Sequence, residues 1–194
     1  QLIYEMRLYL ILYNFSNIMW FIRLDFVYKD RLCMDSIRLK ARAKINLGLD
    51  VIGRRDNGYH DVRMVMQTVG LYDRIIMTRI PEDDIRIRTN IGFLPVNENN
   101  LIYKAIMLMK NKYGFSGGVE VDLNKFIPVA AGMAGGSSDA ACALIGVNRL
   151  YDLNVPVKEL MKIGVEIGAD VPYCLMRGTA LAEGIGEKLT RLPD

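Results

Sequence analysis

The sequence has few of the residues on which several enzyme classes depend. It contains one histidine, His60, whereas zinc sites of the common types need two. A Ser-His-Asp triad would have to use the same histidine, and the chain has no G-x-S-x-G elbow. The cysteines number three and show no C-x-x-C spacing, which is typical of reduced thiols in a cytoplasmic protein: Cys33, Cys142 and Cys174. We therefore expect no metal hydrolase, no esterase and no disulfide scaffold.

Excess charge and the common nucleotide motifs are missing as well. The 25 Lys and Arg residues against 22 Asp and Glu leave a net charge of +3, which is too small to indicate a nucleic-acid-binding protein. Neither G-x-x-x-x-G-K-[ST] nor a strand followed by G-x-G-x-x-G occurs. Hydrophobic residues make up 51% of the 194 residues, enough for the core of one ordinary domain. The charge by itself therefore gives no argument for a nucleic acid as partner.

Residues 1–33 differ from the rest of the chain. Residues 8–22 carry no charge, yet this stretch is shorter than the roughly 20 residues that cross a bilayer as a helix, and no small-x-small cleavage site follows it. We favour the interpretation that translation starts at Met34 and that residues 1–33 are an upstream extension. A membrane segment or a partner-binding segment is the alternative.

The next part of the sequence has the pattern of β-structure. Residues 37–51 alternate polar and apolar side chains, as a half-buried strand does. A turn at 56–58 precedes two further predicted strands, 60–71 and 74–80, and residues 85–88 alternate again. We expect a β meander or a pair of hairpins up to Thr89.

Helical patterns follow. Asn99 or Asn100 can cap a predicted helix over 101–113 that Gly114 ends, and residues 119–123 form a short strand. A small-residue helix is expected within 132–151, another helix from Pro156 to a stop at Gly168, and short strands with a turn at 184–186 over 171–192. Strands, then helices, then strands indicate an α+β domain.

The most informative stretch is glycine-rich, over residues 128–141. Glycines at 132, 135 and 136 let backbone N–H groups turn towards one point, and Ser137 or Ser138 can cap the helix that begins there. Such convergence of donors suits an anionic phosphate. The alternative is a plain turn with an ordinary serine cap.

This stretch resembles the phosphate-binding motif of the GHMP kinases, named for galactokinase, homoserine kinase, mevalonate kinase and phosphomevalonate kinase. The matching residues are Pro128, Gly132, Gly136, Ser137 and Ser138. Residues 43–47, 58–60, 168–172 and 182–187 are further similar to one branch, the 4-diphosphocytidyl-2-C-methyl-D-erythritol kinases (CDP-methylerythritol kinases below). The matching motifs span 34–194 in the right order.

The resemblance implies a GHMP-kinase amino-terminal domain of the ribosomal protein domain 2-like type and ATP-dependent phosphorylation of the 2-hydroxyl of CDP-methylerythritol, in non-mevalonate isoprenoid biosynthesis. Asp170 matches the catalytic base and Lys44 the catalytic lysine, whose cation would hold Asp170 ionised and offset charge on the phosphoryl group. Asn46 shares a strand face with Lys44 and would contact the substrate. Tyr59 and His60 match residues that recognise cytidine; an aromatic pair packed on a hairpin is the alternative.

ATP is the expected cosubstrate, accompanied by Mg²⁺. The resemblance implies a small-molecule substrate as the partner, with no nucleic acid and no membrane. The resemblance assigns ATP binding to Pro128, Ala130, Ala131, Gly132, Met133, Ala134, Gly135, Gly136, Ser137 and Ser138, with Asn100 and Lys125 on the adenine side. Asn100 is equally a helix cap, and Lys125 equally a solvated strand end. Asp139 either helps to position Mg²⁺ or complements the helix dipole, so no metal ligand is assigned.

Two departures from the family pattern stand out. Met133 and Ala134 replace the frequent leucine and glycine, which we take as a mild change. The sequence ends at Asp194, before the family's second domain, so we expect a truncated enzyme without the carboxy-terminal domain. Three alternatives stay open: another GHMP-type small-molecule kinase, a nucleotide-binding module without turnover, and an RNA-associated domain.

Overall fold

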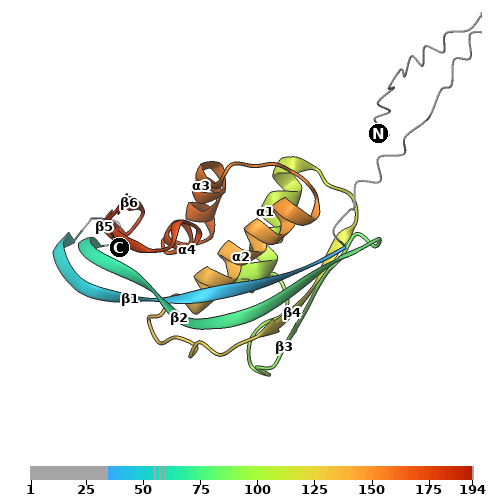
Figure 1. Ribbon diagram of the computed structural model, residues 1–194, viewed down its shortest axis with the longest axis horizontal. Helices are drawn as coiled ribbons and strands as arrows, with labels where there is room; N and C mark the ends of the chain where they lie inside the picture. Colours follow the sequence, from blue (N-terminus) through green and yellow to red (C-terminus); the bar gives the residue numbers. More distant parts are fainter. Residues whose placement is uncertain (1–34, 55, 57, 59, 194) are drawn as a thin grey trace, which may run out of the picture. The chain divides into compact units, whose positions relative to one another are not determined.

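A computed structural model describes residues 35–54, 56, 58 and 60–193. The interpretation of residues 1–33 as an extension therefore lies outside the described residues, and so does the role expected for Tyr59. In the described part, four helices cover one face of a six-stranded sheet (Figure 1). This arrangement confirms the α+β class.

The two longest strands of the sheet pair with each other. β1 (Ser36–Arg54) pairs antiparallel with β2 (His60–Ile80) over nearly its whole length. The strands predicted at 60–71 and 74–80 are thus one strand, because the residues between them stay extended opposite β1. The expected turn between β1 and β2 is present at Asp56 and Gly58, and Gly58 has a φ of +86°.

The remaining strands pair along the other edge of β2. β4 (Gly118–Asn124) and β5 (Thr179–Gly184) both pair antiparallel with β2, β3 (Ile85–Thr89) runs parallel to β4, and β6 (Lys188–Arg191) pairs with β5. The predicted meander is therefore wrong at β3. Although β3 follows β2 in sequence, β4 lies between them.

The helices are α1 (Leu101–Tyr113), α2 (Gly135–Leu150), α3 (Val157–Ile167) and α4 (Val171–Met176). Asn100 caps α1 as one of the two predicted residues, and Gly114 ends it in the left-handed region at φ +65°. α4 was expected to be strand. With six residues and Pro172 near its start it is too short to show a helical period.

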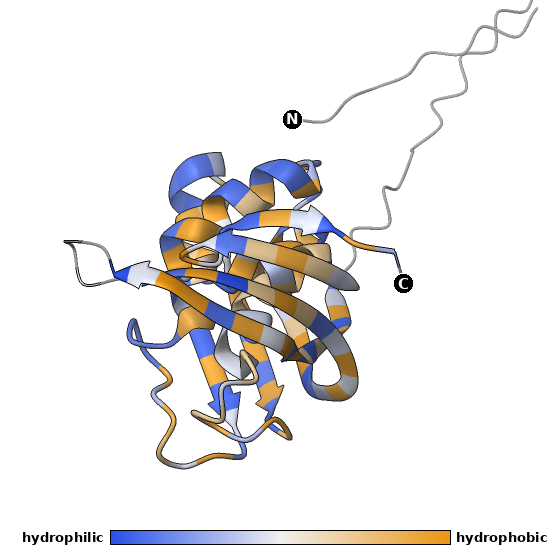
Figure 2. Cartoon of the chain, turned by 90° about the vertical axis from the view of Figure 1, so that its left-hand side faces the viewer, coloured by the Kyte–Doolittle hydropathy of each residue, from blue (hydrophilic) through white to orange (hydrophobic). Residues whose placement is uncertain are grey.

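The core lies between the sheet and the helices. Strand residues of β2 and β4 meet residues of α1 and α2 there, among them Ile75, Met77, Val121, Ile106, Met109 and Leu144, all at most 1% exposed. Figure 2 shows the matching alternation of hydrophobic and hydrophilic residues along the strands. Cys142 and Cys174 are buried and unpaired. Within the described residues no helix has the length and apolarity to cross a membrane.

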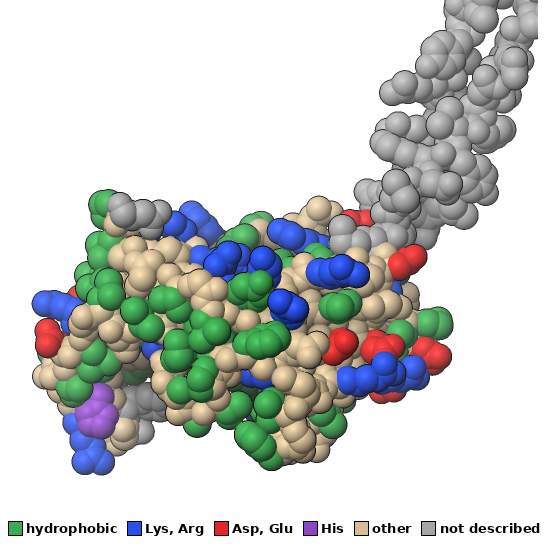
Figure 3. Space-filling model, turned by 60° about the horizontal axis from the view of Figure 1, so that its bottom comes forward, with side chains coloured by type: hydrophobic (Ala, Val, Ile, Leu, Met, Phe, Trp, Pro, Cys, Tyr) green, Lys and Arg blue, Asp and Glu red, His purple; other side chains and the backbone are tan. Residues whose placement is uncertain are grey.

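The outer half of β1 is exposed on both faces. Buried residues of this strand end at Lys44, and the large apolar residues beyond it are exposed: Leu47, Leu49, Val51 and Ile52 are each at least 50% exposed. The expectation of a half-buried strand over 37–51 holds only for its first half, where α2 packs on β1. Figure 3 shows hydrophobic side chains gathered on the face of the sheet turned away from the helices.

Candidate active site

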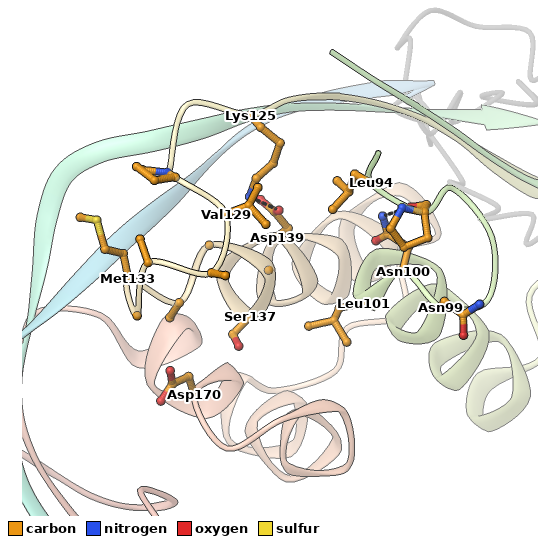
Figure 4. Close-up of a pocket in the computed structure, with 18 residues that line it drawn as sticks. Leu94, Asn99, Asn100, Leu101, Lys125, Val129, Met133, Ser137, Asp139 and Asp170 are labelled. Carbon is orange, nitrogen blue, oxygen red and sulfur yellow. Dashed lines mark hydrogen bonds and ion pairs between the residues drawn. The ribbon is translucent and has the colours of Figure 1, made fainter. Parts of the chain in front are cut away.

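A pocket of about 410 Å³ opens where the loop before α2 meets the start of α1 and the residue before α4 (Figure 4). Its wall contains residues 128–137, Asn100, Lys125, Asp139 and Asp170. The ten residues of the predicted phosphate loop, from 128 to 138, thus lie at this pocket with one exception. Ser138 is buried and does not line it.

The loop takes a strained path into α2. Gly132 has a φ of +73°, and two alanines, Ala130 and Ala134, also lie in the left-handed region at +59° and +55°. Ala134 is the residue that precedes α2, and no side chain caps the helix. The serine cap predicted at Ser137 or Ser138 is therefore wrong, because the helix begins before both. The first-turn N–H groups are left to a ligand or to water.

Two hydrogen bonds tie this loop to β1. The Lys44 N–H donates to the Met133 carbonyl (3.1 Å), and the Ser138 hydroxyl donates to the Arg42 carbonyl (2.7 Å). These bonds flank an irregularity in the β1–β2 pairing between Arg42 and Lys44. Ala43 and Lys44 are both buried, which strict strand alternation would not allow. The irregularity thus aims the Lys44 side chain at the pocket end of α4.

Lys44 and Asp170 meet although they are far apart in sequence. The Lys44 ammonium lies 3.7 Å from Asp170 Oδ2 and donates to Asn46 Oδ1 (3.1 Å). Lys44 is only 5% exposed, whereas the Asp170 side chain is 29% exposed and lines the pocket. Asp170 precedes α4 directly, so it stands in a turn between two helices and not in the expected turn from helix to strand.

The residues expected on the substrate side are only partly located. Asn46 is exposed and bonded to Lys44, as the shared strand face predicted. His60 is exposed at the start of β2, opposite Arg54, and neither it nor Asn46 is part of the pocket wall. A substrate that touched both would have to lie along the exposed half of the β1–β2 hairpin.

The two residues expected at adenine have their polar groups occupied. Asn100 Oδ1 accepts from the Ile102 N–H (2.8 Å), and its Nδ2 donates to the Pro95 carbonyl (2.7 Å). The Lys125 ammonium donates to Asp73 Oδ2 (2.5 Å) and Asp139 Oδ2 (2.7 Å). Both residues line the pocket, so the contacts left for a ligand are those of the Lys125 stem and of the atoms around the Asn100 cap.

Sequence reasoning missed Asp73, a fully buried carboxylate in β2. The signal was present: Asp73 stands two and four residues before the buried Ile75 and Met77, on their inward-facing side of the strand. Its partner Asp139 is also buried, and neither role considered for it took account of the ion pair with Lys125. Burial raises the pKa of Asp139 to about 7, while the Lys125 charge acts in the opposite direction.

Comparison with known proteins agrees with this geometry. The GHMP kinases N terminal domain family matches residues 100–178, which contain the glycine-rich loop and Asp170. The chain is 89% identical over 161 residues to the 4-diphosphocytidyl-2-C-methyl-D-erythritol kinase of Lachnospira eligens, covering 83% of this chain and 56% of that protein. The chain is thus similar to the amino-terminal half of a GHMP kinase. The resemblance inferred from the sequence motifs is confirmed.

Other relatives of this chain carry the same name. The kinase of Lachnoclostridium phytofermentans is 62% identical over 160 residues, which are 82% of this chain and 55% of that protein. A crystal structure of 4-(cytidine 5'-diphospho)-2C-methyl-D-erythritol kinase matches at 36% identity with a TM-score of 0.70, over 80% of this chain and 55% of the other. The chain thus spans about half the length of the relatives it matches.

More distant structures show the fold alone. Homoserine kinase from Cytophaga hutchinsonii superposes with a TM-score of 0.64 at 22% identity, over 88% of this chain and 55% of the other. At this identity the likeness shows the arrangement of sheet and helices alone. It says nothing about which alcohol is bound.

Proposed function

We propose that this chain supplies the ATP-binding and phosphoryl-transfer residues of a CDP-methylerythritol kinase, which phosphorylates the 2-hydroxyl of its substrate. The observation that carries the proposal is the placement of the Lys44–Asp170 pair, 3.7 Å apart, beside a pocket walled by the glycine-rich loop. The choice among alcohols is supported by the relatives' names, above all the one that is 89% identical.

In this mechanism Asp170 acts on the acceptor hydroxyl. An alcohol is a poor nucleophile at neutral pH, so a carboxylate within hydrogen-bond reach orients it and accepts its proton. The alcohol oxygen forms a bond to the γ-phosphorus of ATP while the bond from that phosphorus to the β-phosphate oxygen breaks. ADP leaves, and the proton passes from the hydroxyl to Asp170. The partial exposure of Asp170 lets that proton return to water afterwards.

Lys44 complements the charges that develop in this step. Its ammonium is held between Asp170 and Asn46 at the end of the buried part of β1, so little side-chain freedom is lost when the substrates bind. A fixed cation beside the transferred group stabilises its negative charge more strongly in a water-poor site than in bulk water.

The ATP phosphates fit the loop and the open helix end. The N–H groups in the first turn of α2 have no side-chain cap, and the helix dipole favours an anion at that end. Gly132 and Ala134 in the left-handed region turn further backbone towards the same space. Phosphate binding at this point would place the γ-phosphate on the side of the pocket where Asp170 lies.

Mg²⁺ would enter with ATP. The described residues contain no group of three or more His, Cys, Asp or Glu side chains that could hold a metal ion. Asp139 lines the pocket, but one of its oxygens binds Lys125 and the other is buried away from solvent. Neither oxygen fits a hydrated ion, so we assign no protein ligand and expect the phosphates to carry the Mg²⁺.

The substrate end of the proposal rests on the hairpin between β1 and β2. His60 and Tyr59 are proposed to recognise cytidine, by a hydrogen bond to the base edge and by stacking. The exposed apolar half of β1 offers surface for the rest of the substrate. We further propose that the protein acts in the cytoplasm, as its free, buried cysteines Cys142 and Cys174 suggest.

The test is phosphate transfer by the 194-residue chain. ADP release is measured with ATP, Mg²⁺ and one alcohol at a time, using CDP-methylerythritol, mevalonate, homoserine and galactose, and the product is identified by ³¹P NMR. The proposal predicts a new phosphomonoester only with CDP-methylerythritol. Transfer to another alcohol would establish the rival kinase. ATP binding without any transfer, measured by calorimetry, would favour the nucleotide-binding module.

A further inference from the structure

Three charged side chains from separate elements form a buried cluster behind the pocket. Asp73 comes from β2, Lys125 follows β4, and Asp139 belongs to α2. The Lys125 ammonium bridges the two carboxylates at 2.5 and 2.7 Å, and all three side chains are at most 5% exposed. Figure 4 shows Lys125 reaching down from the loop towards Asp139.

Asp73 makes a second set of bonds that involves the loop itself. Its Oδ1 accepts from the backbone N–H groups of Phe126 (2.5 Å) and Ile127 (2.8 Å), the two residues that lead into the loop at Pro128. One buried carboxylate therefore holds both the ammonium of Lys125 and the next two backbone donors. Bonds from charged acceptors to buried N–H groups are the stronger kind, and they are costly to leave unmade.

The far end of the same loop contacts this cluster as well. A Cβ at Gly135 would lie 3.1 Å from the Lys125 ammonium nitrogen and 3.1 Å from Ile127 Cγ2. The absence of a side chain at Gly135 thus lets the first turn of α2 approach the cluster, and Asp139 binds it one turn later. The entry of the loop at 126–127 and its exit at 135–139 meet the same three charges.

We propose that Asp73 is a positioning residue that clamps both ends of residues 126–135 and so sets the shape of the loop that receives the ATP phosphates. Asp73 itself, fully buried, does not touch the nucleotide and acts through the loop backbone and Lys125. The identity of the ligand rests on the proposed function, whereas the clamp is a property of the loop.

The test compares Asp73→Ala with Asp73→Asn. Asp73→Ala removes every bond that Asp73 makes and leaves the bond between Lys125 and Asp139. Asp73→Asn keeps an acceptor for the two N–H groups and a similar shape, so it serves if the alanine variant does not fold. We expect the dissociation constant for ATP to rise about tenfold or more in Asp73→Ala and less in Asp73→Asn. The affinity for CDP-methylerythritol should stay within about twofold. Amide exchange at Phe126 and Ile127 should accelerate in both variants.

A core variant of the same strand gives the matched control. Ile75→Val lies two residues along the same face of β2 and weakens the core without touching the loop. It should lower stability and leave ATP binding and the exchange at 126–127 unchanged. Unchanged ATP affinity in Asp73→Ala, or an equal loss for both ligands, would overturn the clamp. If the unmodified chain itself fails to bind ATP, the proposed function fails, and the exchange rates at 126–127 alone decide whether Asp73 clamps the loop.

Discussion

The two sides of the pocket use polar residues in opposite ways. On the side of α1 and Lys125, which we call the closed side, the polar atoms of the Asn100 and Lys125 side chains form hydrogen bonds within the protein. On the side of α4, which we call the open side, Asp170 is 29% exposed and forms an ion pair with Lys44. Both sides line the same cavity. Polar residues at a pocket therefore have two different roles. Some stabilise the wall through hydrogen bonds within the protein, whereas others are exposed and can bind a ligand.

The largest expected effect tests the open side. Asp170→Asn keeps the size of the side chain and removes its basicity, so we expect kcat for phosphate transfer to fall about 100-fold to 10,000-fold. The free energy of unfolding should change by less than about 1 kcal/mol, because the ion pair is partly exposed. Steady-state kinetics and urea unfolding measure the two. The control is Asp122→Asn at an exposed position of β4, and an Asp170→Asn protein with full activity would exclude Asp170 as the base.

The next prediction concerns Asp139 on the closed side and the dependence of stability on pH. Burial raises the pKa of Asp139 from 3.8 to about 7, so the folded state binds this proton more tightly than the unfolded state. The stability from this group is present below about pH 4 and is lost as the pH rises to about 7. Relative to Asp139→Asn, the wild type should lose about 2 kcal/mol of unfolding free energy between pH 5 and pH 8. Parallel curves for the two proteins would show that Asp139 does not titrate in this range.

A smaller effect separates capping from ligand binding at Asn100. Asn100→Ala removes the N-cap of α1 and should cost about 1 kcal/mol of unfolding free energy. The dissociation constant for ATP should change less than about twofold, since both polar atoms of the Asn100 side chain already form hydrogen bonds within the protein. The control is Glu98→Ala, at an exposed position outside the pocket wall. Weaker ATP binding at unchanged stability would show that Asn100 contacts the ligand, as the residues of the open side are expected to do.

The smallest effect lies in the loop between the two sides. Ala134 has a φ of +55°, so Ala134→Gly relieves backbone strain at the cost of more freedom in the unfolded chain. We expect a gain of about 0.5 kcal/mol or less in thermal or urea unfolding. Ala140→Gly, inside α2, should instead lose about 1 kcal/mol. A loss of stability in both variants would mean that alanine at position 134, in place of the family's frequent glycine, is as mild a change as the sequence suggested.

Local patterns predicted most of the elements but not how they pair. α1 was predictable because its cap, its apolar stripe and its terminal glycine are all local. The position of β3 was not, since its partner β4 follows it by a helix and the choice between β2 and β4 depends on long-range contacts. Likewise α4 is too short for its periodicity to be seen.

The candidate site was predictable by a different route. Nothing in composition or spacing brings Lys44 near Asp170; their pairing was expected only because each matched a family motif, and the structure places them 3.7 Å apart. No sequence motif predicted the hydrogen bonds of Asp73. Such buried polar clusters depend on contacts among distant segments, and only an unexpected charge at an inward strand position hints at them.

Ala43 and Lys44 are adjacent and both buried, so the face on which each later side chain of β1 lies depends on the number of residues in the strand. Before this point odd-numbered residues of β1 face the helices, and after it the even-numbered Lys44 and Asn46 share a face. Inserting one residue between Lys44 and Asn46 would put these two side chains on opposite faces of the strand, although both would still be encoded. In this strand the number of residues is as much a part of the candidate site as their identity.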